Sequence, residues 1–478
     1  MSYRTRMLTL SLSLTTILLG SCVVGPDYHR PSVEVPASFK EAGKWKLAEP
    51  ADQTHLGRWW EIYQDPQLNA LVSQVEVSNQ TVRAAEAQYR QALALLGAAR
   101  AAYYPTLGAG LSATRGSGNS ATVSNGNSAT GSSATSDRVS LSASWEADLW
   151  GGIRRKVESG QATVQASAAD LGAALLSAQA TLVQAYVQLR VSDAQKQLLD
   201  RNVAAYQRSL EITRNRYEAG VAGRLDVLQG ETQLQSTQAQ AIDLGVARAQ
   251  LEHAIAILIG KPPSELNIAV ASGIPALPEI PPTVPSTLLE RRPDIAGAER
   301  RVAAANAEIG VAQAAFFPSL TLSGTGGYQN SSFANLLTLP NRFWSLGPAL
   351  ALTLFDAGAR TAQKEQAIAA YDQNVATYRQ TVLGAFQDVE DNLAALRVLA
   401  EEAGVQEQAT KAAADSLEQA NNQYKAGTIS YLNVVTAEAT FLAADRSRLD
   451  IAGRQLLAGV ALFKALGGDW PVMGRRPS

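Results

Sequence analysis

Few residues of this chain have the types and spacing that chemistry at a site would need. The 478 residues include three histidines and one cysteine, so a protein-made zinc site is not expected and a disulfide within the chain is impossible. No Gly-rich phosphate loop or nucleophile elbow occurs, and acidic pairs such as Glu401-Glu402 suit solvated helix faces. The 41 basic and 43 acidic side chains give a net charge of −2, which argues against nucleic acid as a partner. We therefore expect no enzyme, no metal site and no cofactor.

The single cysteine, Cys22, is the strongest candidate for chemistry. Residues 1–21 have a basic start and an apolar stretch of about a dozen residues, which is typical of a signal peptide and too short to span a membrane. Leu19-Gly20-Ser21 before Cys22 resemble the lipobox of bacterial lipoproteins. We expect acylation of Cys22 with palmitate-type chains and anchoring in outer-membrane lipid, since Val23 rather than Asp follows. A chance cysteine is the alternative interpretation.

Most of the chain after Cys22 is predicted to be helical. Alanine accounts for 82 residues and aromatic residues for 6%, which is typical of long helices that pack closely through small side chains. No stretch after the signal reaches about 18 consecutive apolar residues, so no spanning helix is expected. Residues 152–216 and 358–424 are nearly free of proline, and each could form a helix of roughly 95–100 Å. Shorter helices are predicted over 66–103, 225–259, 287–315 and 430–466.

The chain contains two copies of one pattern. Residues 101–107 match 314–320, and Arg216-Tyr217-Glu218-Ala219-Gly220 matches Gln423-Tyr424-Lys425-Ala426-Gly427. The first copy is longer because of residues 112–137, which are rich in Ser, Gly, Asn and Thr and are predicted as a solvated loop. The predicted organisation is a signal peptide (1–21), an N-terminal segment (22–65), a first repeat (66–260), a proline-rich linker (261–286), a second repeat (287–466) and a tail (467–478).

Four segments alternate with the period of two residues that indicates strands. In 139–149, for example, Leu141 and Ala143 oppose Ser140 and Ser142. Strands of this length with one apolar and one small polar face are typical of a transmembrane β-barrel, and a soluble sheet with one wet face is the alternative. The strands are expected at about 106–115, 138–149, 319–328 and 346–355.

Four strands cannot close a barrel, and open sheet edges are not tolerated in lipid. The small polar face indicates a water-filled lumen, so several chains should contribute to one barrel. Three chains in a cyclic arrangement would supply twelve strands. The residues thus predict a membrane α+β protein in which three chains share a 12-stranded β-barrel, with four strands per chain.

Aromatic residues gather where helices give way to strands. Side chains of this type prefer membrane–water interfaces, so they are expected to form a girdle at one interface. Ordinary packing at helix–strand junctions is the alternative. The residues are Tyr103, Tyr104, Trp150, Phe316, Phe317 and Phe355.

Several motifs together resemble the outer-membrane factors, the TolC-like family, and within it the NodT/OprM-type efflux lipoproteins. They are Trp59-Trp60 before Asp65-Pro66, Arg291-Arg292-Pro293-Asp294-Ile295 at a helix start, Ala314-Ala315-Phe316-Phe317-Pro318 at its end, and the repeated Tyr-x-x-Gly element. The resemblance covers the whole mature chain. It implies a homotrimer whose 12-stranded β-barrel is continuous with a long α-helical barrel in the periplasm. The homotrimer would dock with a periplasmic adaptor and an inner-membrane pump of the RND type. The implied function is a passive exit duct for small molecules and drugs across the periplasm and the outer membrane.

The resemblance also implies a gate at the periplasmic tip, near the turns that follow the long helices. Asp226 matches a gate position of the family, whereas Asn433 and Thr436 stand where relatives often carry Asp. We therefore expect a weakly acidic aperture at Tyr217, held by hydrogen bonds from Tyr424, Asp226 and Asn433. Asp226 and Asn433 could equally cap the return helices, because both residue types favour helix starts.

Other functions remain as alternatives. Within the same scaffold, the chain could serve type I protein secretion or signal export. A periplasmic coiled-coil adaptor without a pore is the alternative from a different class, although the paired strands between the helices argue against it. Arg291, Arg292 and Asp294 are interpreted as structural residues at a helix start, where Pro293 suits the first turn.

Overall fold

The computed structural model describes residues 23–36, 38–42, 56–117, 133–271, 273–278 and 292–468. Cys22 and the predicted signal peptide lie outside the described residues. The chain divides into two compact units. The first comprises Met1–Pro31, Arg90–Ala166 and Ala298–Thr377, and the second comprises Ser32–Tyr89, Ser167–Gly297 and Tyr378–Ser478.

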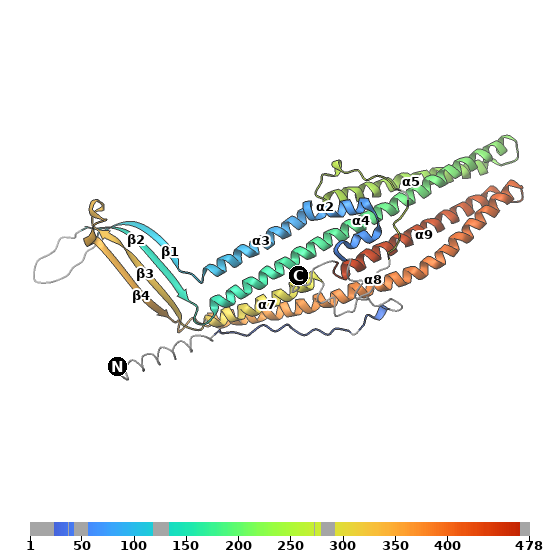
Figure 1. Ribbon diagram of the computed structural model, residues 1–478. Helices are drawn as coiled ribbons and strands as arrows, with labels where there is room; N and C mark the ends of the chain where they lie inside the picture. The colour runs from blue at the N-terminus through green and yellow to red at the C-terminus, as the bar shows by residue number, and fades with distance from the viewer. Residues whose placement is uncertain are drawn as a thin grey trace, which may run out of the picture. The chain divides into compact units, whose positions relative to one another are not determined.

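The first unit contains one sheet of antiparallel strands in the order β1-β2-β3-β4 (Figure 1). Its strands are β1 (Thr106–Ser117), β2 (Ser133–Ala147), β3 (Ser319–Asn330) and β4 (Arg342–Ala351). Residues 116–117 and 133–137, which we expected in a solvated loop, are strand instead. They pair directly with one another along β1 and β2, and this ladder outweighs the weak strand propensity of Ser and Gly. β4 covers 342–351, where 346–355 was expected.

The strand register separates the two residue types onto opposite faces of the sheet. Apolar residues oppose apolar residues, as Leu111 opposes Val139. Small polar residues oppose one another in the same way, as Ser144 opposes Ser323. No other described segment of the single chain covers the apolar face, and Leu346 is 79% exposed. A contiguous apolar face of this size marks a contact with lipid or with another protein.

The helices repeat with equal lengths in the two copies. α4 (Gly152–Glu218) and α8 (Ala359–Lys425) have 67 residues each, which corresponds to about 100 Å. α5 (Arg224–Leu258) and α9 (Tyr431–Ala465) have 35 each, and α3 (Gln80–Ala101) and α7 (Pro293–Ala314) have 22 each. Figure 1 shows α4 turning back into α5 and α8 into α9. Equal lengths are what a duplicated element predicts.

The first approach helix is broken, contrary to our expectation of one helix over 66–103. α2 (Pro66–Ser78) ends before Asn79, and α3 follows it. The side-chain oxygen of Asn79 caps α3 by accepting the amides of Thr81 and Val82 at 2.9 and 3.0 Å. Its amide group donates to the carbonyl oxygen of Leu258, the last residue of α5, at 2.7 Å. The side chain thus joins the break to the end of the return helix.

Two of the sequence motifs form the packing around α2. Asp65 caps α2 with Pro66 in its first turn, and the hydroxyl of Tyr186 donates to the Asp65 carboxylate at 2.7 Å. Trp59 lies in the 3-10 segment Leu56–Tyr63 and stacks on Phe463 with ring centroids 5.6 Å apart. These motifs therefore hold non-repeated segments against the helices of the second unit.

Among the described residues, α4 contains a window of 18 residues with mean hydropathy 1.2, which suits a membrane span by length and composition. We had expected no such helix. However, 44% of this window is buried within the protein, and core helices of soluble proteins have the same composition. A single helix of this length and composition is therefore weak evidence for a membrane span.

Candidate functional site

The predicted aperture residues lie around the two turns that close the helix pairs α4–α5 and α8–α9. Gly220 and Gly427 have positive φ angles of 72° and 77°, which favour glycine. The chain then closes each helix end in the same way, since the amide of Val221 bonds the carbonyl of Arg216, and the amide of Thr428 bonds that of Gln423. The repeated Tyr-x-x-Gly element is therefore explained by the geometry of these turns.

Asp226 and Asn433 occupy the same place in their helices and bond locally. The Asp226 carboxylate accepts the amide of Gly223, the N-cap residue of α5, at 3.2 Å. The Asn433 amide donates to the hydroxyl oxygen of Ser430, the N-cap residue of α9, at 3.1 Å. Within one chain, both residues thus stabilise helix starts, and the gate role expected of them stays a prediction.

Tyr217 and Tyr424 are equivalent in the repeats but differ in their surroundings. Tyr217 is 44% exposed, whereas Tyr424 is 8% exposed and packs on Tyr431 with ring centroids 5.3 Å apart. Among the described residues of the single chain, the Tyr424 hydroxyl has no hydrogen-bond partner, and the bond that we expected from it at the aperture stays a prediction. The second turn is therefore the more tightly packed of the two.

The two helix pairs are joined in part by residues that the sequence analysis did not select for the aperture, namely Arg216, Ser209 and Tyr431. The Arg216 guanidinium lies 4.5 Å from the centre of the Tyr424 ring and donates to the Tyr424 carbonyl oxygen at 3.0 Å. A second contact joins α4 to α9, where the hydroxyl oxygens of Ser209 and Tyr431 lie 3.2 Å apart. The sequence did contain an indication for Arg216: the two copies of the repeated element differ at this position, where the second copy has Gln423.

A buried carboxyl group lies near this junction. Glu438 on α9 is 6% exposed, and its Oε2 atom has no hydrogen-bond partner among the described residues. Burial raises the pKa of Glu438 to about 7. Its charge in turn contributes to raising the pKa values of Tyr206 on α4 and Tyr431 on α9, for which burial is the larger cause. A carboxyl of this kind is close to half ionised near neutral pH.

Asn433 and Thr436 line one groove of about 410 Å³ between α8 and α9. The Thr436 hydroxyl donates to the carbonyl of Leu432 in its own helix at 2.8 Å. The groove contains no charged side chain; its other residues are Ala413, Ser416, Gln419, Ala420, Gln423, Ile429, Ala437 and Thr440. The second turn region is thus polar and uncharged on this side, in keeping with the absence of Asp at 433 and 436.

The aromatic residues predicted at the membrane interface lie beside one end of the sheet. β1 and β3 begin at this end and β2 and β4 end there, because Thr106 opposes Ser144 and Ser319 opposes Ala351. Trp150 stacks on Phe317 with ring centroids 4.8 Å apart and donates to the Pro318 carbonyl at 2.7 Å. The exposed fractions of the others are 37% for Tyr103, 71% for Tyr104, 38% for Phe316 and 86% for Phe355.

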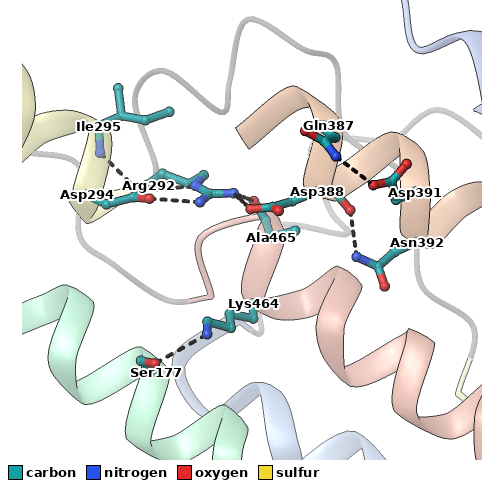
Figure 2. Close-up of polar contacts among 10 residues, drawn as sticks. All are labelled: Ser177, Arg292, Asp294, Ile295, Gln387, Asp388, Asp391, Asn392, Lys464 and Ala465. Atoms are coloured by element: carbon teal, nitrogen blue, oxygen red, sulfur yellow. Dashed lines mark hydrogen bonds and ion pairs between the residues drawn. The ribbon is translucent and has the colours of Figure 1, made fainter. Parts of the chain in front are cut away.

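Arg292 joins three helices of the second unit (Figure 2). It donates to the carboxylate of Asp294 on α7 at 2.7 Å and to that of Asp388 on α8 at 3.0 Å. It also donates to the carbonyl of Ala465, the last residue of α9, at 3.2 Å. These contacts agree with the structural role inferred for Arg292 and Asp294, while Arg291 lies outside the described residues. In the described part of the chain, no group of three or more His, Cys, Asp or Glu residues could hold a metal ion.

Comparisons with known proteins match the two repeats and the whole chain. The family model described as outer membrane efflux protein matches residues 71–261 and 284–468. The chain is 30% identical to the probable efflux pump outer membrane protein TtgC of Pseudomonas putida, over 96% of this chain and 95% of that protein. It is 28% identical to the probable outer membrane lipoprotein SilC of Salmonella typhimurium, over 96% and 98%. The solved structure of the outer-membrane channel OprN has a TM-score of 0.87 and 32% identity, and covers 94% of this chain and 100% of that one.

Proposed function

Because this chain belongs to the outer membrane efflux protein family, we propose that it is the passive exit duct of a tripartite efflux system for small molecules. Its cargo would be delivered by an inner-membrane pump of the RND type through a periplasmic adaptor. The relatives are transport proteins, and we assign no catalytic role to any residue. The observation that carries the proposal is the combination of two open sheet edges with a small polar sheet face, which suits a shared, water-filled barrel.

Four predictions made from the sequence are confirmed. They are the family, the function as the outer-membrane channel component of an efflux system, the location in the bacterial outer membrane, and the fold class. The fold is that of the trimeric outer-membrane channels, with four strands and the long helices contributed by each chain.

The assembly that we propose follows from the sheet. Among the described residues of a single chain, the outer edges of β1 and β4 have no strand partner, and lipid offers no hydrogen bonds to such edges. Pairing β4 of one chain with β1 of the next would satisfy both edges in a closed ring. Three chains would form a ring of twelve strands, with the Ser, Thr and Gly face toward the lumen.

We further propose that the two turns form the aperture of the duct. Tyr217, Asp226, Tyr424, Asn433 and Thr436 would lie there, and a threefold axis would repeat each residue in a ring. The contact between Arg216 and Tyr424 supports a closed state held within each chain, because it joins the two helix pairs directly. The uncharged groove beside α9 supports a weakly acidic rather than a strongly acidic aperture.

The membrane side of the proposal concerns the anchor and the aromatic residues. Acylation of Cys22 would hold the chain in the outer membrane, as the lipobox-like sequence suggests. Tyr103, Tyr104, Trp150, Phe316, Phe317 and Phe355 would form the girdle at the periplasmic interface. Their position beside one end of the sheet supports this arrangement.

The proposed function is tested with the purified full-length protein in detergent and in planar bilayers. We expect an oligomer that resists mild detergent, dissociates to monomers on heating, has the mass of three chains, and conducts ions. A monomeric product that does not conduct would contradict the duct and favour the adaptor without a pore.

A further inference from the structure

The segment Val23–Tyr28 contains no helix or strand, but it is bound along its length to the first unit; we call it the N-terminal strap. The amide of Val24 donates to the carbonyl oxygen of Trp150 at 3.0 Å. The side-chain amide of Asn306, a buried residue of α7, donates to the carbonyl oxygen of Pro26 at 3.0 Å. The strap therefore contacts the start of α4 in the first repeat and α7 in the second.

Arg155 provides most of the charged contacts of the strap. It is 4% exposed, and its Nε donates to the carbonyl oxygen of Val24 at 3.2 Å. Its Nη2 donates to the carbonyl oxygen of Gly25 at 3.1 Å and to the carboxylate of Asp27 at 2.9 Å. Its Nη1 donates to Glu158 at 2.8 Å. Of these partners Glu158 alone lies outside the strap, so the strap satisfies most of the donors of this guanidinium.

Three glycines let the strap approach the helices more closely than any other residue would. Gly25 has a φ angle of 101°, and a Cβ atom there would lie 2.4 Å from the Cα of Gly310. A Cβ on Gly310 would lie 2.8 Å from Cγ of Arg155. On the other side, a Cβ on Gly151 would lie 2.8 Å from a methyl carbon of Val23. The site is thus shaped for this peptide as well as bonded to it.

We propose that Arg155, with Gly25 and Gly310, fixes the position of the lipid anchor by holding the N-terminal strap against α4 and α7. The inference rests on the proposed acylation of Cys22, the residue before Val23. In this arrangement the anchor is a fixed attachment and not a free tether. It enters the protein beside Gly151 and Trp150, at the strand ends where the aromatic girdle is proposed.

A fixed attachment has a consequence that a tether does not have. If the strap is cut downstream of the contacts with Arg155, the lipidated fragment should stay bound to the protein. The test inserts a protease site between Glu34 and Val35, both of which are exposed, in the full-length chain labelled with an alkyne analogue of palmitate. After cleavage in detergent, the labelled fragment that remains with the protein is measured over time.

We expect the labelled fragment to stay with the wild-type protein and with the control Lys156→Ala, which changes an exposed neighbour. In Arg155→Gln it should leave at least about tenfold faster, because several charge-assisted hydrogen bonds are lost. Asp27→Ala changes only the strap, so it should also speed release even if Arg155→Gln impairs folding. Rapid release from the wild type, or equal retention by both variants and the wild type, would overturn the proposal. Absence of label at Cys22 would instead count against the anchor itself.

Discussion

Arg216 lies 4.5 Å from the ring centre of Tyr424 and bonds its carbonyl oxygen, so one side chain of the first repeat holds the turn of the second. The repeats are equivalent here in sequence position, but the contact is not reciprocal. Gln423 replaces Arg216 in the second copy, and Tyr217, the counterpart of Tyr424, is half exposed. The closed turn region is therefore asymmetric within each chain.

Replacing Arg216 with Ala should open the duct. The change removes a cation–π contact worth about 0.5–2 kcal/mol and a hydrogen bond from a charged group. We expect the open probability in planar bilayers to rise by about tenfold. Arg214→Ala is the matched control, since its ion pair with Glu231 is exposed and joins α4 to α5 within one helix pair. Equal conductance of the wild type and Arg216→Ala would show that this contact does not hold the closed state.

Asp226 and Asn433 allow the gate and the capping interpretations to be separated. If they only cap helices, Asp226→Ala and Asn433→Ala should each lower stability by about 0.5–2 kcal/mol and leave conductance unchanged. If Asp226 also lines the aperture, Asp226→Ala should in addition lower the preference for cations over anions, whereas Asn433→Ala should not. Single-channel conductance and reversal potentials in a salt gradient measure both. An unchanged conductance and selectivity in Asp226→Ala would exclude it from the gate.

Glu438 should make the packing of α9 depend on pH. Its pKa of about 7 in the folded chain lies above the ordinary carboxyl value, so the fold favours the protonated form. The contribution of the protonated Glu438 carboxyl to the free energy of unfolding is fully present below about pH 4.5. It is lost as pH rises through about pH 7, and its total is about 3 kcal/mol. We expect amide hydrogen exchange in α9, corrected for intrinsic rates, to be slower at about pH 5 than at about pH 8.

The matched variants for this effect are Glu438→Gln and Glu418→Gln. Glu438→Gln removes the titration, so the corrected protection of α9 should no longer depend on pH. Glu418 is exposed on α8, and Glu418→Gln should behave like the wild type. The same pH dependence in Glu438→Gln as in the wild type would assign the effect to another group.

Much of the fold follows from the sequence because its signals are repeated and periodic. One long helix, one pair of alternating strands and one glycine turn occur in each of the two copies, and the helices of the two copies agree in length. The errors arose where one contact outweighs a local pattern. We expected one helix over 66–103, but the cap that Asn79 forms and its bond to Leu258 break the helix there.

The candidate site was less predictable for a related reason. Tyr217 and Tyr424 read alike in the sequence, and only the packing between repeats buries one of them. Glu438 belongs to an ordinary helical segment, and nothing local indicates that its carboxyl is buried beside Tyr206 and Tyr431. Contacts between distant segments decide such cases, and one sequence contains no direct record of them.

Arg292 offers a comparison between a buried and an exposed ion pair in the second unit. Its side chain is 12% exposed and bonds two carboxylates and the end of α9, whereas Arg397 is 46% exposed and pairs with Glu41. Arg292→Ala should lower the free energy of unfolding by about 2–4 kcal/mol, because three helices lose their shared donor. Arg397→Ala should cost about 0–1 kcal/mol, since water replaces an exposed partner. Arg292→Lys should fall between them, because one ammonium group cannot reproduce the fork that reaches Asp294, Asp388 and Ala465. Urea unfolding followed by circular dichroism checks the order, and equal losses for Arg292→Ala and Arg397→Ala would show that the three-helix contact adds nothing to stability.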